Sequence, residues 1–313
     1  MNVLYKYYSS NFNLIDHIKR PLIKLSHTES FNDPFECALS EKLAEKLTEY
    51  QLSQGFIKDE YKEIFKQDFK IEYMNTPKEY GVVSLTETHR NILMWAHYAN
   101  SHRGVCIGYK RDFLNSKLEI NSQDPYKNKL DMTPKRVRYD SQRFDIQKYN
   151  FDKTINTKPI HHIIESMTLK SNDWMYEKEH RCIVPFRYGE YIKLISTPTK
   201  ALAKIIERLE KSSLITKLEH AHEYEISKNA KLGKLHDFNI NLGRIAKEPY
   251  AMILKEIDVE KIHSIHLGCQ YDKSAQSDIE MFLKINKEKF GHIRLYRYAV
   301  NSQSFDIIER VIK

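Results

Sequence analysis

The sequence predicts an α+β fold built on one mixed β-sheet, in a single domain that carries helical insertions. A run rich in β-forming aromatic residues opens the chain at residues 2–9, and a compact strand–helix–strand unit spans residues 80–109. A β–α–β pattern closes the chain over residues 262–300. Charged amphipathic stretches near residues 41–75 and 198–240 lie between these strands, so we expect them to form the inserted helices.

Local signals define the N-terminal elements. Residues 2–9, with the sequence NVLYKYYS, predict a strand, and the stretch NFNLIDHIKR that follows predicts a short helix with an asparagine cap that ends at Pro21. Residues 22–26 predict a second strand. The stretch FNDPFE at 31–36 predicts a turn, because Asn and Asp bond their own backbone and proline prevents a helix from continuing.

The middle of the chain alternates helices and strands. Apolar periodicity and flanking glycines predict strands at 80–87, 103–109 and 176–186. Helical spacing predicts helices at 91–102 and 160–170. We expect the tryptophan of the first of these helices to be buried beneath the sheet.

The C-terminal third combines a long helix with the closing β–α–β pattern. Residues 198–226 read as one long, charged helix. A strand is expected at 262–268, a helix at 274–289 and a final strand at 292–300.

Composition limits the class of protein. The chain has 313 residues and a formal net charge of +8, and no run of about 18 apolar residues that could cross a membrane. The N-terminus lacks the pattern of a signal peptide. The cysteines are scattered without a Cys-x-x-Cys pair, so we expect a cytoplasmic protein without structural zinc or membrane association. The positive charge is compatible with a nucleic-acid partner or with an ordinary solvated surface.

Two glutamates stand out at the start of the predicted strand YEKEHRCIVPF. Residues i and i+2 of a strand point to the same face, so Glu177 and Glu179 would lie side by side at the mouth of the sheet, with Arg181 on that face too. Like charges this close repel each other unless a basic partner, a ligand or a proton is present. A strand edge with solvated charges is the alternative interpretation.

Hydroxyl groups gather in the unit at 80–109. Ser84 and Thr86 are two apart in a strand, so their hydroxyls face the same way. The helix that follows carries Tyr98, with Trp95 and His97 beside it as further candidates. Such hydroxyls can orient a sugar or a phosphate, or they can bond only backbone groups.

Two further polar features lie near the N-terminus. Lys6 is a single cation within the first strand, where its ammonium needs an anion or water. The turn FNDPFE contributes Asn32, Asp33 and Glu36. An edge-strand charge and a purely structural turn are the alternative interpretations.

Several of these motifs together resemble one family. The stretches LYKYYS, FNDPFEC, MWAHYANSHRGVCIGY, WMYEKEHRCIVPF and IHSIHLG are similar to those of the bacterial DUF2971 family, from residue 4 to about residue 300. That family consists of proteins of uncharacterised function, so this resemblance implies no activity. The helices near 41–75 and 198–240 fall between the motifs and are expected to be family-variable insertions.

The order of the motifs also resembles, more distantly, that of ADP-ribosyltransferases. This resemblance implies a split or curved mixed sheet, NAD as the substrate and no metal. By it, Glu179 would be the catalytic glutamate and Glu177 the accessory carboxylate. Ser84, Thr86 and Tyr98 would line the nicotinamide pocket.

The sequence departs from that pattern at Lys6. ADP-ribosyltransferases have His or Arg at this place to hold the adenosine ribose. The donor is therefore either NAD held in another way or a different molecule.

The chemistry implied by the resemblance fits the acidic pair. Cleavage of the nicotinamide–ribose bond passes through an oxocarbenium-like state, which a fixed carboxylate such as Glu179 stabilises. Glu177 can orient the acceptor or take its proton, and Arg181 would keep both carboxylates ionised. The leading hypothesis is an ADP-ribosyltransferase-like enzyme that modifies a macromolecule, with nucleic acid mildly favoured by the charge, or a nucleotide. By analogy it would act as a toxin or phage-defence effector, with a regulatory protein partner left open.

Two other classes of function remain open. In the first, Asp33, Glu36, Glu177 and Glu179 bind Mg²⁺ in a nuclease, since Mg²⁺ takes hard oxygen ligands. Arg181 then stands where such sites usually have a lysine. In the second, the protein is a non-catalytic binding module whose carboxylates are structural.

Overall fold

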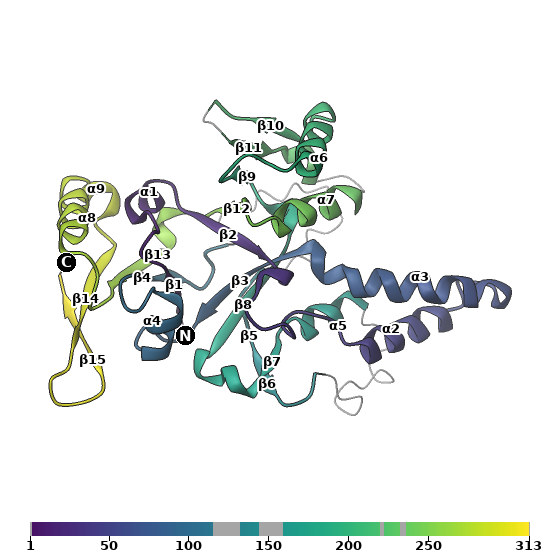
Figure 1. The fold of residues 1–313 in the computed structure, drawn as a ribbon, viewed down its shortest axis with the longest axis horizontal. Helices are drawn as coiled ribbons and strands as arrows, with labels where there is room; N and C mark the ends of the chain where they lie inside the picture. Colours follow the sequence, from purple (N-terminus) through teal and green to yellow (C-terminus); the bar gives the residue numbers. More distant parts are fainter. Residues whose placement is uncertain (1, 115–131, 144–158, 220–221, 232–235, 313) are drawn as a thin grey trace.

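A computed structural model describes residues 2–114, 132–143, 159–219, 222–231 and 236–312 (Figure 1). Within these residues, thirteen strands form one mixed sheet. Helices pack against it and extend from it (Figure 1). The prediction of an α+β fold with a mixed sheet is confirmed. None of the helices described is both long and apolar enough to cross a membrane.

The sheet has one long path and one branch. The path contains, in spatial order, β10 (Ile215–Lys217), β11 (Glu223–Ile226), β9 (Tyr191–Leu194), β12 (Ala251–Glu256), β2 (Leu22–His27), β3 (Tyr80–Thr86), β1 (Val3–Tyr8), β4 (Val105–Lys110), β13 (Ile262–Leu267), β14 (Arg294–Val300) and β15 (Ile307–Val311). The branch is formed by β8 (Glu179–Pro185), which pairs with β3 along its length, and by β5 (Lys135–Arg136), which pairs with β8. A separate parallel pair contains β6 (Arg138–Asp140) and β7 (Leu169–Ser171).

The helices surround this sheet. They are α1 (Leu14–Lys19), α2 (Glu41–Ser53), α3 (Lys62–Asn75), α4 (Ile92–Tyr98), α5 (Pro159–Ser166), α6 (Lys200–Lys211), α7 (His236–Lys247), α8 (Lys273–Ile285) and α9 (Lys287–Phe290). Figure 1 shows α2 and α3 side by side as a projecting arm, α6 with β9, β10 and β11 as an upper lobe, and α8 and α9 beside β14. The helices expected near 41–75 are therefore α2 and α3.

Apolar residues pack on both faces of the sheet. The largest buried cluster includes Leu25, Ile107 and Val184 from three strands and Leu242 from α7. On the other face of β1 and β4, Trp95 from α4 is fully buried in a second cluster with neighbouring aromatic rings. The expectation that Trp95 is buried beneath the sheet is confirmed. Burial of apolar area on both faces is the main stabilising contribution to such a fold.

Most predicted strands are present. β1, β3, β4 and β8 lie in one sheet as expected, and β13 and β14 are parallel strands separated in sequence by α8. β15 pairs with β14 and was not predicted. The helix expected at 91–102 ends at Tyr98, and the helix expected at 160–170 ends at Ser166, after which β7 begins at Leu169.

The strand predicted at 176–186 is wrong at its start. Residues Asn172–Glu177 form a 3₁₀ helix, η4, and the backbone of Lys178 turns through the left-handed region with a φ of 46°. β8 begins only at Glu179. Glu177 and Glu179 therefore belong to different elements, joined by a tight turn.

The long helix predicted at 198–226 is also wrong beyond its first half. α6 ends at Lys211, Ser213 has a left-handed φ of 54°, and β10 and β11 follow. The β-branched residues Ile215 and Thr216 favour a strand at this point. Positions 220–221 and 232–235 of the insertion expected at 198–240 lie outside the described residues.

Candidate active site at the divergence of two strands

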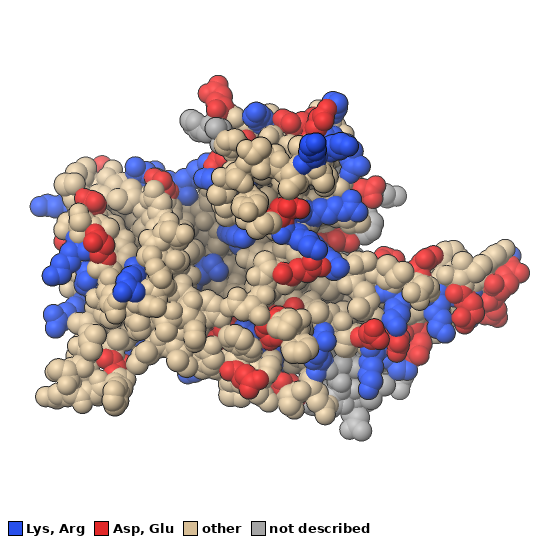
Figure 2. Space-filling model, in the orientation of Figure 1, with Lys and Arg blue, Asp and Glu red and all other residues tan. Residues whose placement is uncertain are grey.

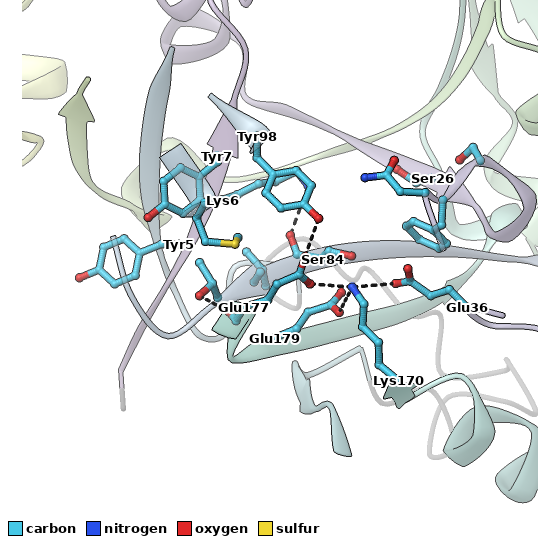
Figure 3. Close-up of a pocket in the computed structure, with 16 residues that line it drawn as sticks. Tyr5, Lys6, Tyr7, Ser26, Glu36, Ser84, Tyr98, Lys170, Glu177 and Glu179 are labelled. Atoms are coloured by element: carbon cyan, nitrogen blue, oxygen red, sulfur yellow. Dashed lines mark hydrogen bonds and ion pairs between the residues drawn. The ribbon is translucent and has the colours of Figure 1, made fainter. Parts of the chain in front are cut away.

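The candidate site lies where β1 and β2 move apart along one edge of β3. β1 pairs with β3 at Thr86, and β2 pairs with it at Gly81 and Val82. Residues 83–85 lie between these contacts, whereas the opposite edge of β3 pairs continuously with β8. A cavity of about 180 Å³ lies at this divergence (Figure 3).

Five segments line the cavity: β1, the chain from Ser26 to Glu36, β3, α4, and the chain from β7 to the start of β8. These segments are distant in sequence, and the sheet brings them together. Eight of the residues predicted as site candidates line the cavity: Lys6, Asn32, Glu36, Ser84, Thr86, Tyr98, Glu177 and Glu179.

Four other candidates lie elsewhere. Asp33 is buried in the turn, where its carboxylate accepts a hydrogen bond of 2.9 Å from the backbone N–H of Phe35. Trp95 belongs to the core, and His97 is exposed. Arg181 is fully buried behind the wall of the cavity.

Three carboxylates converge on the ammonium group of Lys170. Its Nζ lies 2.6 Å from Glu177, 3.3 Å from Glu179 and 3.5 Å from Glu36, and each of these side chains is at most 5% exposed. Lys170 is on β7, and its ammonium also lies 4.7 Å from the ring centre of Trp174. The three N–H groups of Lys170 thus match three acceptors, which allows the acidic side chains to be buried together.

Arg181 neutralises the same cluster from the other side. Its Nε and Nη2 donate to the two oxygens of Glu179 at 2.9 and 2.8 Å, in a bidentate pair. Nη2 also donates to Glu36, and Nη1 donates to the carbonyl of Met167 at 2.6 Å. Arg181 was expected to lie on the same strand face as both glutamates; it faces Glu179, but its second carboxylate partner is Glu36 and not Glu177.

These contacts shift the pKa values of the cluster. Burial alone would raise the pKa of Glu179, but Arg181 and Lys170 outweigh burial and lower it to about 2. Burial raises the pKa of Glu36, although Arg181 opposes this shift. Burial lowers the pKa of Lys170, but the three carboxylates outweigh it and the net shift is upward. Glu179, Lys170 and Arg181 are therefore ionised at neutral pH.

The two acidic residues differ in the number of hydrogen bonds that they already accept. The Glu179 carboxylate accepts three hydrogen bonds, two from nitrogens of Arg181 and one from Lys170. The Glu177 carboxylate accepts one bond from Lys170 at 2.6 Å and one from the hydroxyl of Tyr98 at 2.5 Å. A carboxylate offers about four lone-pair sites, so Glu177 retains the capacity to bind a ligand hydroxyl.

Tyr98 stays a proton donor in this arrangement. Burial and the neighbouring Glu177 carboxylate raise its pKa well above the ordinary value. Thr86 fixes the same region, because its hydroxyl donates a 2.6 Å bond to the backbone carbonyl of Glu177. The turn that carries Glu177 is thereby tied to the end of β3.

Lys6 reaches the cavity from β1. Its Nζ donates to the backbone carbonyl of Ser84 at 3.2 Å, on the segment of β3 that lies between its contacts with β1 and β2. Burial lowers the pKa of Lys6 to about 8, although the Glu179 carboxylate opposes the shift. The ammonium is therefore mostly charged at neutral pH and becomes neutral in mildly alkaline solution.

Lys170 is the main site residue that sequence reasoning missed. The stretch around it was predicted as the end of a helix, where a lysine reads as a solvated charge. The sequence contained only an indirect indication of it. Two carboxylates as close as Glu177 and Glu179 require more than one basic partner, and Arg181 was the only one identified.

Comparisons with known proteins give one match. Neither the search of curated proteins nor the search of solved structures found a match. Residues 94–182, which carry Tyr98, Lys170, Glu177, Glu179 and Arg181, match the model of the family DUF2971, described as a protein of unknown function, so the expected resemblance to that family is confirmed over this part of the chain.

Proposed function

We propose that this protein is an ADP-ribosyltransferase-like enzyme that cleaves the nicotinamide–ribose bond of NAD. The observation that carries the proposal is convergence: Lys6, Ser84, Tyr98, Glu177 and Glu179 come from four separate segments and face one cavity (Figure 3). Buried acids with a cation and hydroxyls around a cavity are typical of a functional site, because such an arrangement is costly for folding alone.

The size of the cavity limits what it can enclose. Its volume of about 180 Å³ is below the roughly 300–1,000 Å³ typical of pockets that hold a whole small molecule. We therefore propose that it takes one end of the dinucleotide, the nicotinamide riboside, while the rest of NAD lies outside.

The proposed reaction breaks one bond and forms one. The bond between ribose C1′ and nicotinamide N1 breaks, and neutral nicotinamide leaves with the bonding electron pair. The ribose becomes oxocarbenium-like. An oxygen or nitrogen atom of the acceptor, or the oxygen of a water molecule, then forms a bond to C1′ and loses its proton. Carboxylates at this position stabilise the positive charge of the transition state.

We assign the contact with ribose to Glu177. The carboxylate of Glu179 already accepts three hydrogen bonds, two of them in the bidentate pair with Arg181, so it has little capacity left for substrate. Glu177 has two free lone-pair sites by the same count, and Tyr98 and Lys170 fix its orientation. Glu179 then acts as a positioning residue that holds Lys170 and Arg181. This assignment moves the catalytic role from Glu179, where the resemblance to ADP-ribosyltransferases places it, to Glu177.

The acceptor is proposed to be a nucleic acid or a nucleotide, on the basis of the net charge of +8. In Figure 2, basic and acidic side chains are interspersed over the visible face, and acidic groups gather toward the free end of the α2–α3 arm. An acceptor of either kind is tested by adding RNA, DNA or free nucleotides to the reaction and looking for transfer of ADP-ribose.

The chemistry of the cluster favours this proposal over a magnesium-dependent nuclease. The ammonium of Lys170 already lies among the three carboxylates, where a divalent cation would need to be. Asp33, the fourth ligand of the nuclease hypothesis, binds the backbone of its own turn instead. Calorimetry with NAD and, separately, with Mg²⁺ distinguishes the two. Heat of binding with Mg²⁺ alone would favour the nuclease. If neither NAD nor Mg²⁺ gives heat of binding, the cavity binds a different ligand.

Nicotinamide release from NAD tests the activity directly. We expect the wild-type protein to release nicotinamide above a blank without enzyme, with a further increase when the acceptor is supplied. Release equal to the blank in the presence of RNA, DNA and nucleotides would contradict the proposal.

Replacing Lys6 by methionine should weaken NAD binding. A charge-assisted hydrogen bond to the donor contributes about 1.5–3 kcal/mol, so the dissociation constant should rise about ten- to a hundredfold. Because the pKa of Lys6 is about 8 and only the ammonium form donates a charge-assisted hydrogen bond to the donor, wild-type affinity should fall as the pH rises through that value. Calorimetry at pH 7 and pH 9.5 checks both statements. Equal dissociation constants for the two proteins at pH 7 would show that Lys6 does not contact NAD and has only a structural role, through its bond to the carbonyl of Ser84.

A further inference from the structure

A second group of side chains that can bind a metal ion lies outside the cavity, near the end of the sheet formed by β13, β14 and β15. It consists of His89, from the loop between β3 and α4, His266 on β13 and Glu309 on β15. One donor atom from each lies within 4.8 Å of the other two. Oε1 of Glu309 is 2.7 Å from Nδ1 of His266 and 3.4 Å from Nδ1 of His89.

The surrounding contacts orient these donors. Nδ1–H of His266 donates to Glu309 at 2.7 Å, and Nε2 lies 3.0 Å from the hydroxyl of Ser264. When a cation replaces the proton on Nδ1, the proton moves to Nε2 and is donated to Ser264, which leaves the lone pair of Nδ1 for the ion. Metal-binding histidines typically donate their other ring N–H in this way, which fixes the tautomer. His266 is also stacked between His89 and Tyr296, with ring centres 4.2 and 4.9 Å away. The ring that would bind is therefore already held in place.

We propose that His89, His266 and Glu309 form a binding site for a divalent first-row transition-metal ion. Two imidazoles and one carboxylate are a ligand set that suits Zn²⁺ and its neighbours, whereas Mg²⁺ and Ca²⁺ prefer oxygen ligands alone. Bonds of about 2.0–2.2 Å place neighbouring ligand atoms of a tetrahedral site about 3.3 Å apart. The two separations measured from Glu309 Oε1, 2.7 and 3.4 Å, lie on either side of that value.

The site leaves room for further ligands. The hydroxyl of Tyr298 bonds Nδ1 of His89 and lies 3.5 Å from Glu309 Oε1, so it is the nearest additional oxygen. The side chain of Glu309 is 31% exposed, which gives an ion access from solvent, whereas His266 is nearly fully buried. Three protein ligands leave at least one coordination position for Tyr298, water or a small molecule.

An ion at this site would connect three segments that are far apart in sequence. It would join the loop after β3 to the strands β13 and β15, and α4, which follows that loop, carries Tyr98 to the cavity. Tyr5, which lines the cavity, packs its ring against His89 and His266 with ring centres 4.6 and 5.7 Å away. Metal binding should therefore stabilise the folded chain.

The test uses Zn²⁺ and the full chain after treatment with a chelator. Isothermal titration calorimetry should show one saturable Zn²⁺ site in the wild type, and Zn²⁺ should raise the melting temperature. Glu309→Gln keeps the size of the side chain but removes its charge, and should weaken binding at least tenfold. Ser264→Ala, which removes the hydroxyl that bonds Nε2 of His266, should weaken it by about 10–100-fold.

A matched histidine controls for unspecific binding. His292 lies 3.7 Å from the carboxylate of Glu260, outside the proposed site, so His292→Ala should bind Zn²⁺ like the wild type. A wild type without a saturable site, or a Glu309→Gln variant that binds like the wild type, would show that the three side chains form only a hydrogen-bonded network. Neither measurement involves NAD, so this inference stands or falls independently of the proposed reaction.

Discussion

Replacing Glu177 by glutamine should lower nicotinamide release from NAD by at least about 100-fold, while the protein still folds and binds NAD. Loss of one electrostatic stabiliser in an active site typically lowers turnover by about 10²–10³-fold. Glutamine keeps the shape and can still accept from Tyr98, but it removes the charge that would stabilise the oxocarbenium-like state. The measurement is the rate of nicotinamide release at saturating NAD, with the dissociation constant measured separately.

Two matched substitutions make this result specific. Glu87 lies just after β3, next to Thr86, and its carboxylate bonds His180, so Glu87→Gln should leave turnover within about twofold if only charges at the cavity matter. Glu179→Gln should mainly lower stability, because it removes the negative charge that compensates the buried cations of Arg181 and Lys170. A folded Glu179→Gln protein without activity, beside an active Glu177→Gln protein, would restore the assignment implied by the resemblance.

Seven strands of the sheet were predictable because they have strong local signals, whereas β5, β9, β12 and β15 were not predicted. The aromatic run of β1, Gly81 at the start of β3 and Gly104 just before β4 mark strands that also lie together in space. The errors occurred where one or two backbone angles decide the structure. Lys178 and Ser213 adopt left-handed conformations at the ends of helical segments, and neither residue is a glycine or an asparagine that would signal this turn.

The acidic pair could be located from sequence, but its surroundings could not. The idea that Glu177 and Glu179 share one strand face was wrong, yet both reach the cavity because the turn at Lys178 brings Glu177 back to it. Lys170 could not be assigned, since nothing in its local sequence specifies that β7 places it beside three carboxylates. The pairing of Lys170 with these carboxylates depends on the tertiary structure, and local sequence patterns do not reveal it.

Arg181→Met should lower the free energy of unfolding by about 3–5 kcal/mol, the range typical of removing one partner of a buried ion pair. Arg181 is fully buried, and it donates two bonds to Glu179 and one each to Glu36 and Met167. Methionine fills much of the same volume, so the main loss is the charge that compensates two buried carboxylates. Urea unfolding at pH 7 measures the change.

Arg136→Met is the matched control, because Arg136 lies on β5, which pairs with β8, and its side chain is 75% exposed. That substitution should change stability by no more than about 0.5 kcal/mol. If the two variants lost similar stability, the cluster would contribute little to folding.

The pH dependence separates loss of charge from loss of packing. In the wild type, the pKa of Glu179 is about 2 in the folded chain against an ordinary 4.5, so its stabilising contribution is present above pH 4.5 and is lost as the pH falls toward 2. Without Arg181, burial dominates and the pKa of Glu179 should rise above 4.5. The folded variant then takes up protons before the unfolded chain does, so it gains stability as the pH falls through that raised value. The difference between wild type and Arg181→Met should therefore shrink between pH 7 and pH 3, whereas a purely steric defect would leave it constant.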